Sequence, residues 1–94
     1  MFYKVRRLLQ ERVSAWAGRA GVPPPTALPL APAPEHVDAD MALSWALSAA
    51  KPARRKPLEI ATELSGELAD PLFASAVPAP PGFVNIRLSQ AALL

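Results

Sequence analysis

Hydrophobic residues near the start of the chain recur at intervals of three and four positions. The stripe consists of Phe2, Val5, Leu9, Val13 and Trp16. Such spacing places apolar side chains on one side of an α-helix, while charged residues such as Arg7 and Glu11 fall outside the stripe. Gly21 and Pro23 are expected to end this first helix.

The segment from Phe83 to Leu88 alternates between two kinds of side chain. One side holds the aliphatic residues Val84, Ile86 and Leu88, and the other holds Phe83, Asn85 and Arg87. Successive side chains of a β-strand point to opposite faces of a sheet. We therefore predict a strand whose aliphatic face enters the core. Its open face carries an aromatic ring, an amide and a guanidinium.

Two further helices are predicted in the middle of the chain. The second has its N-terminal cap at Asp38 or Asp40 and runs to about Ala50. Its inward-facing residues are expected to be Met41, Trp45 and Ala49. The third has Pro57 at its first position, where the missing N–H does least harm. Its apolar face is formed by Ile60, Ala61, Leu64 and Leu68.

The remaining elements are predicted to be strands. Phe73–Val77 precedes the Phe83–Leu88 strand, and the short, rigid connection Pro78–Gly82 between them favours an antiparallel pair. Thr26–Leu30 is a candidate edge strand, because a proline within it cannot donate to a ladder. Pro32–Val37 is a further candidate strand.

This order of elements predicts an α+β fold. About three helices should pack on one face of a small antiparallel sheet, which makes a two-layer sandwich. The 94 residues suffice for one domain, so we expect residues 1–94 to form a single domain with a small core.

Composition excludes several classes of site. The chain has no cysteine and one histidine, His36, so we expect no disulfide, no metal site and no cofactor. Catalytic groups are not clustered, so we expect no enzymatic activity. No apolar run approaches the roughly 20 residues that span a bilayer, and charges interrupt the first segment. We therefore expect a soluble, cytoplasmic protein without a membrane partner.

Charged residues form two local groups, although the formal net charge of +2 is too small to indicate nucleic-acid binding by itself. A basic cluster, Arg54, Arg55 and Lys56, separates the second and third predicted helices. It is either a solvated loop or a set of phosphate contacts. On the third helix, Glu59, Glu63 and Glu67 recur every four residues. Because like charges at this spacing repel, the stripe must face solvent or basic groups, and we expect solvent.

The last two thirds of the chain resemble the N-terminal additional domain of arginyl-tRNA synthetases. That family has a His-Gly-Asp-Tyr turn, a Pro-x-x-Ile-Ala-x-x-Leu helix and a Gly-Pro-Gly-Phe-Ile/Val-Asn-Phe-x-Leu strand. The matching residues are His36 and Asp38 in the turn, Pro57, Ile60, Ala61 and Leu64 in the helix, and Gly82, Phe83, Val84, Asn85 and Leu88 in the strand. The amphipathic first helix also occupies the position of that family's first helix.

Three positions depart from the family pattern. Val37 stands where the family usually has glycine, Ala39 where it has tyrosine, and Pro80 where it has the first glycine of the strand motif. The sequence also contains no His-Ile-Gly-His-like or Lys-Met-Ser-Lys-like signature. We therefore expect that this chain does not activate an amino acid, and that a synthetase catalytic domain is its partner in cis if it is part of a longer protein.

The resemblance implies that the sheet recognises the outer corner of a transfer RNA, chiefly the D-loop of arginine-accepting tRNA. In the family, the strand that corresponds to Phe83–Arg87 carries an aromatic residue and an amide that meet an unpaired nucleotide. This is compatible with the chemistry of RNA recognition, because unstacked loop bases stack on aromatic rings and bond to amides along their edges. The candidate RNA-binding residues are Phe83, Asn85, Arg87, Arg54, Arg55 and Lys56.

Each candidate also has a simpler interpretation. Phe83 could belong to the core or its rim, Asn85 could bond to a neighbouring loop, and Arg87 could pair with a carboxylate. His36 and Asp38 could serve the turn and the helix cap rather than a ligand. An open face with phenylalanine, asparagine and arginine would also suit a protein-interaction or structural domain, since aromatic residues and arginine are enriched at protein interfaces.

Overall fold

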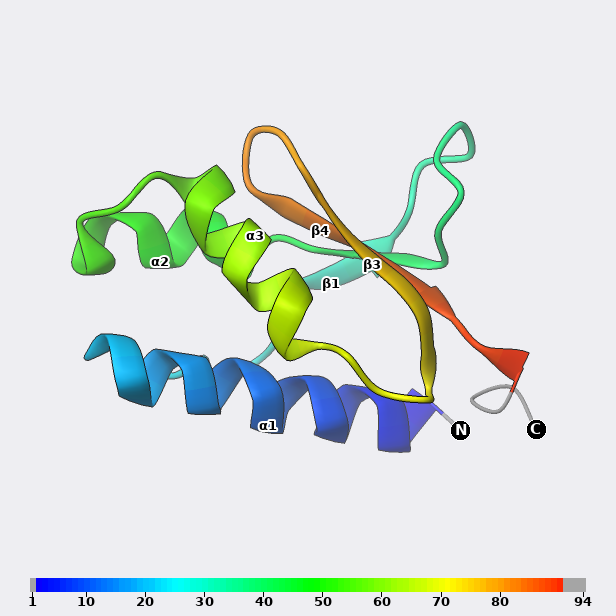
Figure 1. The fold of residues 1–94 in the computed structure, drawn as a ribbon, viewed down its shortest axis with the longest axis horizontal. Coiled ribbons are helices and arrows are strands. Elements are labelled where there is room, and N and C mark those ends of the chain that lie inside the picture. Colours follow the sequence, from blue (N-terminus) through cyan, green and yellow to red (C-terminus); the bar gives the residue numbers. More distant parts are fainter. Residues whose placement is uncertain (1, 91–94) are drawn as a thin grey trace.

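Three helices and a four-stranded antiparallel sheet make up residues 2–90, the part of the chain that the computed structural model describes (Figure 1). The elements are α1 (Phe2–Ala20), β1 (Leu30–Pro32), β2 (Met41–Leu43), α2 (Trp45–Ala53), α3 (Pro57–Glu67), β3 (Phe73–Ala79) and β4 (Phe83–Leu88). The predicted two-layer α+β sandwich is confirmed.

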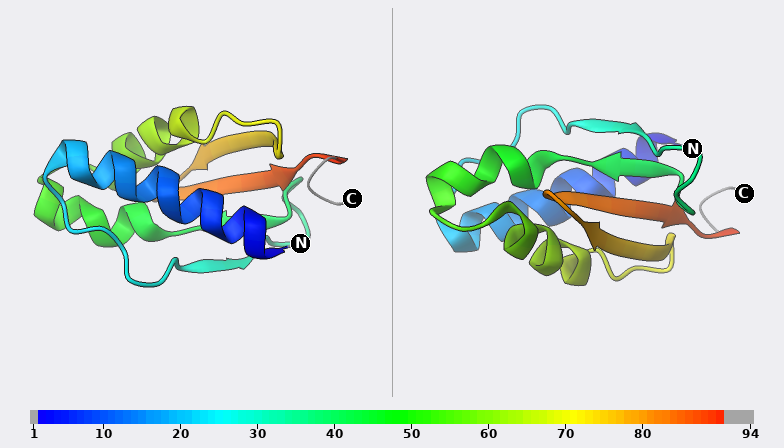
Figure 2. Two further views of the ribbon diagram at one scale, coloured as in Figure 1. Left: turned by 90° about the horizontal axis from the view of Figure 1, so that it is seen from below. Right: turned by 90° about the horizontal axis from the view of Figure 1, so that it is seen from above.

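Strand β4 lies in the middle of the sheet. The spatial order is β1-β2-β4-β3, and every neighbouring pair is antiparallel. Figure 2 shows α1 in front of the strands when the molecule is viewed from below, and the strands in front of α1 when it is viewed from above. One face of the sheet therefore packs on helices, and the other is open.

The core forms between the inner face of β4 and the helices. Val84, Ile86 and Leu88 are only 1%, 0% and 6% exposed. They belong to one buried cluster with residues of α1 and α3, including Val13, Trp16, Ile60 and Leu64. The alternation predicted for β4 is therefore confirmed in its register, since a shift by one residue would have exchanged the two faces.

The first and third helices follow their sequence signals. In α1, the side chains of Val5, Leu9, Val13 and Trp16 are buried, and the side chain of Phe2 lies outside the described part of the chain. Gly21 follows the helix with φ of 71°, a left-handed conformation that glycine adopts without strain. Helix α3 begins at Pro57 as predicted and buries its apolar face.

The prediction that a helix begins after Asp38 or Asp40 is wrong. Met41–Leu43 is strand β2, which pairs with β1 on one side and β4 on the other. Met41 and Leu43 are buried, and Ala42 between them is half-buried. This alternation fits a strand, but three residues are too few to distinguish it from the first turn of a helix. Helix α2 begins only at Trp45, and Ser44 occupies its N-cap position.

The two candidate strands before this segment were also misplaced. Pairing begins at Leu30 and ends at Pro32, so Thr26–Leu30 and Pro32–Val37 each overlap β1 by a single residue. Leu28, just before β1, is buried in the core and takes no part in the pairing. After β1, residues 35–38 form turns and bends.

Replacing Ile86 by alanine tests the packing of β4. Ile86→Ala should lower the free energy of unfolding by about 2 to 5 kcal/mol, because it leaves a cavity in a packed core. Val77→Ala is the matched control, since Val77 lies in the neighbouring strand and is 53% exposed. Urea denaturation of both variants would measure the difference. Equal, small effects would contradict the assignment of Ile86 to the core.

Candidate nucleic-acid interface

The β3–β4 hairpin holds Phe83 and Asn85 on the open face of the sheet. Phe83 pairs with Ala79, and Asn85 pairs with Val77 on one side and Ala42 on the other. Phe83 and Asn85 are both half-buried. The small alanines beside them leave space above the strand, and within residues 2–90 the side-chain amide of Asn85 makes no hydrogen bond.

Close backbone packing fixes the tip of this hairpin. Gly82 is buried against the start of α3 and against Leu47 of α2. A Cβ atom at Gly82 would come within 2.5 Å of the Pro57 Cβ. Glycine is therefore required here by space, and the contact sets the position from which Phe83 begins β4.

The loop between β1 and β2 rises beside the hairpin. The Val37 N–H donates to the Pro34 carbonyl at 3.0 Å, and the Ala39 N–H donates to the Val37 carbonyl at 2.8 Å. At the end of the loop, the Asp40 N–H donates to the Ile86 carbonyl at 2.8 Å, and the Asp40 carboxylate accepts from the Leu88 N–H at 2.6 Å. Asp40 therefore ties the loop to β4 instead of capping a helix.

Loop and hairpin together enclose a hollow of about 320 Å³, which we call the open-face hollow. The loop contributes Pro34, His36 and Val37, the hairpin contributes Ala79, Pro80, Phe83 and Asn85, and β2 contributes Ala42. The volume is at the lower end of the roughly 300 to 1,000 Å³ typical of small-ligand sites. No carboxylate, ammonium or guanidinium lines it, so its chemistry suits a flat, uncharged ring with polar edges.

Arg87 lies beyond Asn85 on the same face of β4. Its Nη1 lies 3.1 Å from Oδ2 of Asp38, and both side chains are largely exposed, 53% and 86% respectively. The structure therefore places Arg87 near the hollow and gives it a carboxylate partner from the loop.

The basic cluster Arg54, Arg55 and Lys56 lies outside the open-face hollow. It lies in the connection between α2 and α3, at the left of Figure 1, whereas the loop before β2 rises at the right. Arg55 pairs with Glu59 and Glu63 of α3. Arg54 and Lys56 are exposed and form no salt bridge within residues 2–90. None of the three lines the open-face hollow, but Lys56 directly precedes Pro57, which packs against Gly82 at the tip of the β3–β4 hairpin.

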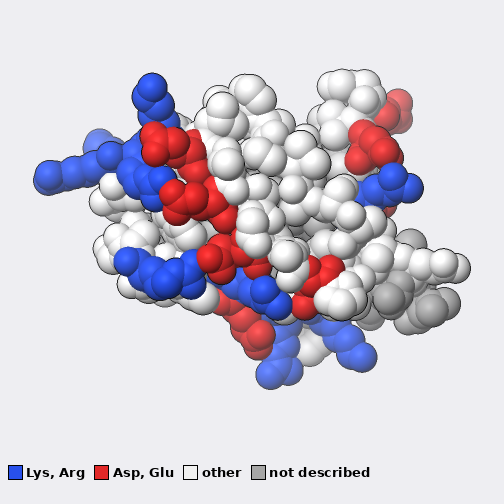
Figure 3. Space-filling model, in the orientation of Figure 1, with Lys and Arg blue, Asp and Glu red and all other residues white. Residues whose placement is uncertain are grey.

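Two members of the glutamate stripe of α3, Glu59 and Glu63, are exposed to solvent as expected, and all three glutamates also pair with basic groups. Arg55 contacts Glu59 and Glu63, and Arg19 of α1 pairs with Glu67. Figure 3 shows these alternating charges along α3 on the front of the molecule. The cause is the packing of α1 beside α3, which brings Arg19 to the stripe and lets Trp16 Nε1 donate to Glu63 at 3.0 Å.

This network changes the acid–base behaviour of Glu63. The guanidinium of Arg55, and then the indole N–H of Trp16, lower the pKa of Glu63 from about 4.5 to about 2. The same contact raises the pKa of Arg55 above its ordinary value. Both groups therefore remain charged at neutral pH, and Arg55 is held in an internal ion pair.

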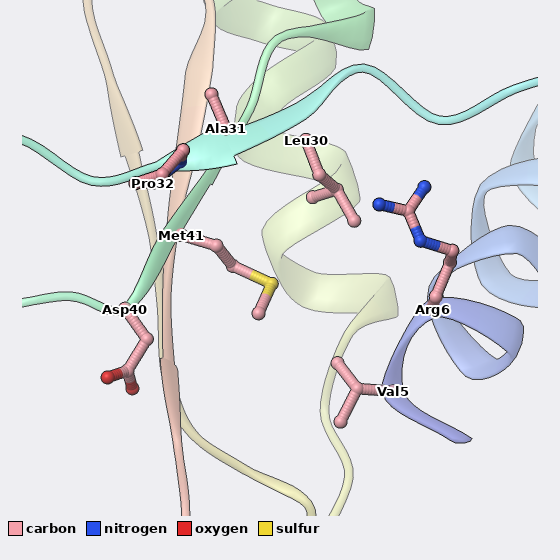
Figure 4. A pocket seen from close by; sticks show the side chains of 7 residues that line it. All are labelled: Val5, Arg6, Leu30, Ala31, Pro32, Asp40 and Met41. Carbon is pink, nitrogen blue, oxygen red and sulfur yellow. The ribbon is translucent and has the colours of Figure 1, made fainter. Parts of the chain in front are cut away.

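A second hollow lies between α1 and the edge of the sheet (Figure 4). It is about 260 Å³ in volume, with Val5, Leu30 and Met41 along its wall and Arg6 at its rim. Val5 and Met41 are already core residues, only 2% and 7% exposed. This hollow is lined mainly by apolar side chains of the core and of β1, with Arg6 and Asp40 as its charged groups.

The described residues contain neither a candidate metal site nor a helix that could span a membrane. Residues 2–90 contain no group of three or more histidine, aspartate or glutamate side chains placed to hold a metal ion. Within the same residues, every helix is too short or too polar to cross a bilayer.

Sequence reasoning found one wall of the open-face hollow and missed the other. The alternation of β4 identified Phe83 and Asn85. The loop wall of Pro34, His36 and Val37 has no periodic pattern, and the only signal was the turn motif around His36. Trp16 and Trp45 are core residues as expected, with their ring centres 5.8 Å apart in an edge-to-face arrangement.

Comparisons with known proteins agree with this arrangement. The sequence profile described as "Arginyl tRNA synthetase N terminal domain" matches residues 4–88. The arginine–tRNA ligase of Cereibacter sphaeroides (strain ATCC 17025) is 36% identical over 95 residues, which cover 97% of this chain and 16% of that protein. The arginine–tRNA ligase of Elusimicrobium minutum is 48% identical over 62 residues, which cover 65% of this chain and 12% of that protein.

A solved structure shows the same fold. The arginyl-tRNA synthetase of Thermus thermophilus superposes with a TM-score of 0.71 and 35% identity, covering 94% of this chain and 14% of that chain. The chain thus spans about 12 to 16% of the length of these three relatives.

The lowered pKa of Glu63 predicts how stability depends on pH. A carboxylate with a lowered pKa in the folded state stabilises the fold above its unfolded pKa, and this contribution is lost as pH falls through the folded value. The free energy of unfolding should therefore decrease between about pH 4.5 and about pH 2. Glu63→Gln should remove this component, so the difference from the wild type should shrink over that interval.

Glu35→Gln serves as the control, because Glu35 is exposed and forms no salt bridge within residues 2–90. Denaturation at several pH values would measure all three proteins. A difference between wild type and Glu63→Gln that stays constant from about pH 4.5 to about pH 2 would contradict the assigned network.

Proposed function

Since the chain belongs to the family of arginyl-tRNA synthetase N-terminal domains, we propose that it is a non-catalytic RNA-binding module. Its target is the D-loop at the outer corner of arginine-accepting tRNA. The observation that carries this proposal is the open-face hollow, in which Phe83 and Asn85 meet a loop wall.

The hollow suits an unpaired base better than a charged ligand. Phe83 offers an aromatic surface, and stacking of one base on one aromatic side chain contributes about 1 to 3 kcal/mol. Asn85 offers both donors and an acceptor to the edge of that base. Because its amide has no partner within residues 2–90, a base edge can bond to it without breaking an internal hydrogen bond.

Phosphates are bound by cations outside the hollow. Arg87 lies on the same face and is the nearest candidate. Arg54 and Lys56 provide a second set, together with Lys51. Arg55 supports this set indirectly, because its ion pairs with α3 hold the connection between the helices.

The relatives that the chain matches are named arginine–tRNA ligases, and the chain covers a small part of each. We therefore assign amino-acid activation to a catalytic domain that acts in cis in a longer synthetase. The module itself contributes binding energy and orientation to the tRNA. Because the proposed ligand is tRNA, we assign the module to the cytoplasm.

Truncating the two side chains of the hollow tests the proposal. Phe83→Ala should lose about 1 to 3 kcal/mol of binding to arginine-accepting tRNA while the fold persists. Asn85→Ala should mainly reduce discrimination between bases, since amide edges carry sequence information that phosphate contacts lack. Titration of the 94-residue chain against intact tRNA and a copy with the D-loop base replaced would measure both effects.

Tyr3→Ala is the control, because Tyr3 is an exposed aromatic residue of α1 and does not line the hollow. Should Phe83→Ala and Asn85→Ala stay folded and bind both RNAs like the wild type, the role of β4 in RNA binding is wrong. The open face would then be assigned to docking of a partner protein.

Neutralising the basic cluster tests whether it contacts RNA phosphates or is only a solvated loop. Arg54→Gln and Lys56→Gln should weaken binding equally for all RNA sequences. Each lost contact to single-stranded RNA should remove about 0.7 from the slope of log K against log salt. Arg55→Gln should instead lower stability, because it leaves Glu59 and Glu63 unpaired. An unchanged slope for Arg54→Gln and Lys56→Gln would show that this cluster is a solvated loop.

A further inference from the structure

The ion pair between Arg87 and Asp38 joins the two walls of the open-face hollow. Arg87 belongs to β4, which contributes Phe83 and Asn85 to one wall of the hollow. Asp38 belongs to the loop whose Pro34, His36 and Val37 form the opposite wall. The pair is a single contact of 3.1 Å between two largely exposed side chains.

The Asp38 carboxylate contacts the guanidinium that would bind an RNA phosphate on this face. A guanidinium binds carboxylate and phosphate oxygens through the same donors, so one excludes the other from a given pair of N–H groups. Exposed ion pairs of this kind contribute little to stability, because both charges are well solvated when they separate. Asp38 can therefore leave Arg87 at low cost.

The rest of the loop remains anchored when Asp38 leaves. The Asp40 N–H and carboxylate bond to Ile86 and Leu88, so the end of the loop stays on β4. These bonds do not involve Asp38, so loss of its contact with Arg87 leaves them in place. The Asp38 contact therefore links Arg87 to the loop that forms one wall of the hollow.

We propose that Asp38 is an intramolecular competitor for the RNA phosphate at Arg87. In the free protein its carboxylate contacts Nη1 of the guanidinium, and RNA binding replaces this contact. This inference rests on the proposed RNA-binding function and adds to it a residue that lowers affinity. Asp38 is a positioning residue, since it acts on the ligand through Arg87.

Neutralising Asp38 should therefore strengthen RNA binding, a result that loss of a merely structural contact would not produce. Glu35→Gln is the matched control, because Glu35 lies on the same loop, is exposed and forms no salt bridge within residues 2–90. Both substitutions raise the net charge by one. We expect Asp38→Asn to bind arginine-accepting tRNA about two- to fivefold more tightly than Glu35→Gln, which matches the range of exposed ion pairs.

A double-mutant cycle isolates the pair. In an Arg87→Gln background, Asp38→Asn should bind no more tightly than Glu35→Gln does in that background. Titrations that show equal affinities for Asp38→Asn and Glu35→Gln, or a gain that persists in the Arg87→Gln background, would overturn the inference.

Phe83→Ala in the same titrations distinguishes failure of the inference from failure of the proposed function. If Phe83→Ala weakens binding while Asp38→Asn has no specific effect, only the competitor role is wrong. If the wild type binds no RNA, the proposed function is wrong and the inference falls with it.

Discussion

Strand β4 pairs with neighbours on both sides, and this double pairing determines which of its side chains enter the core. The partners of Ile86 are Met41 in β2 and Ala76 in β3. Since a strand cannot shift by one residue without moving its aliphatic face to solvent, the core also fixes the open face. Phe83, Asn85 and Arg87 are thus displayed by the same constraint that buries Val84, Ile86 and Leu88.

The charged groups of the molecule divide into two sets. On the helical side, Arg55 and Arg19 neutralise the glutamates of α3, and Arg12 pairs with Asp70 at 3.1 Å. These pairs link α1, α3 and their connections at the edge of the shared core. On the sheet side, the open-face hollow has no charged lining, and Arg87 is held at its edge by a single exposed carboxylate. Electrostatic contacts on the helical side therefore serve the fold, whereas those at the hollow are free to exchange.

Local periodicity predicted the elements that bury a continuous face. Helix α1 and strand β4 each repeat their pattern over several residues, so their neighbours hardly affect the assignment. Met41–Leu43 is too short for its pattern to distinguish a strand from the first turn of a helix. Pairing with β1 and β4 decides its conformation, and that information is not local. The same reason explains why β1 was misplaced.

The candidate site was predictable on one side only. Phe83 and Asn85 follow from alternation, but the loop wall depends on hydrogen bonds of Asp40 to residues more than 40 positions away. The partners of the α3 glutamates likewise depend on how α1 packs beside α3. Asp38 was interpreted as a cap from its place before an apolar segment, and only the three-dimensional arrangement gives it Arg87 as a partner.

Nuclear magnetic resonance can locate the RNA contact directly. Amide chemical shifts of the 94-residue chain would be followed during titration with arginine-accepting tRNA. We predict that the largest changes occur at Val37, Phe83 and Asn85, which line the open-face hollow. Large changes confined to α1 or to residues 51–56, with the hollow unaffected, would contradict the central claim that an unpaired base binds on the open face of β4.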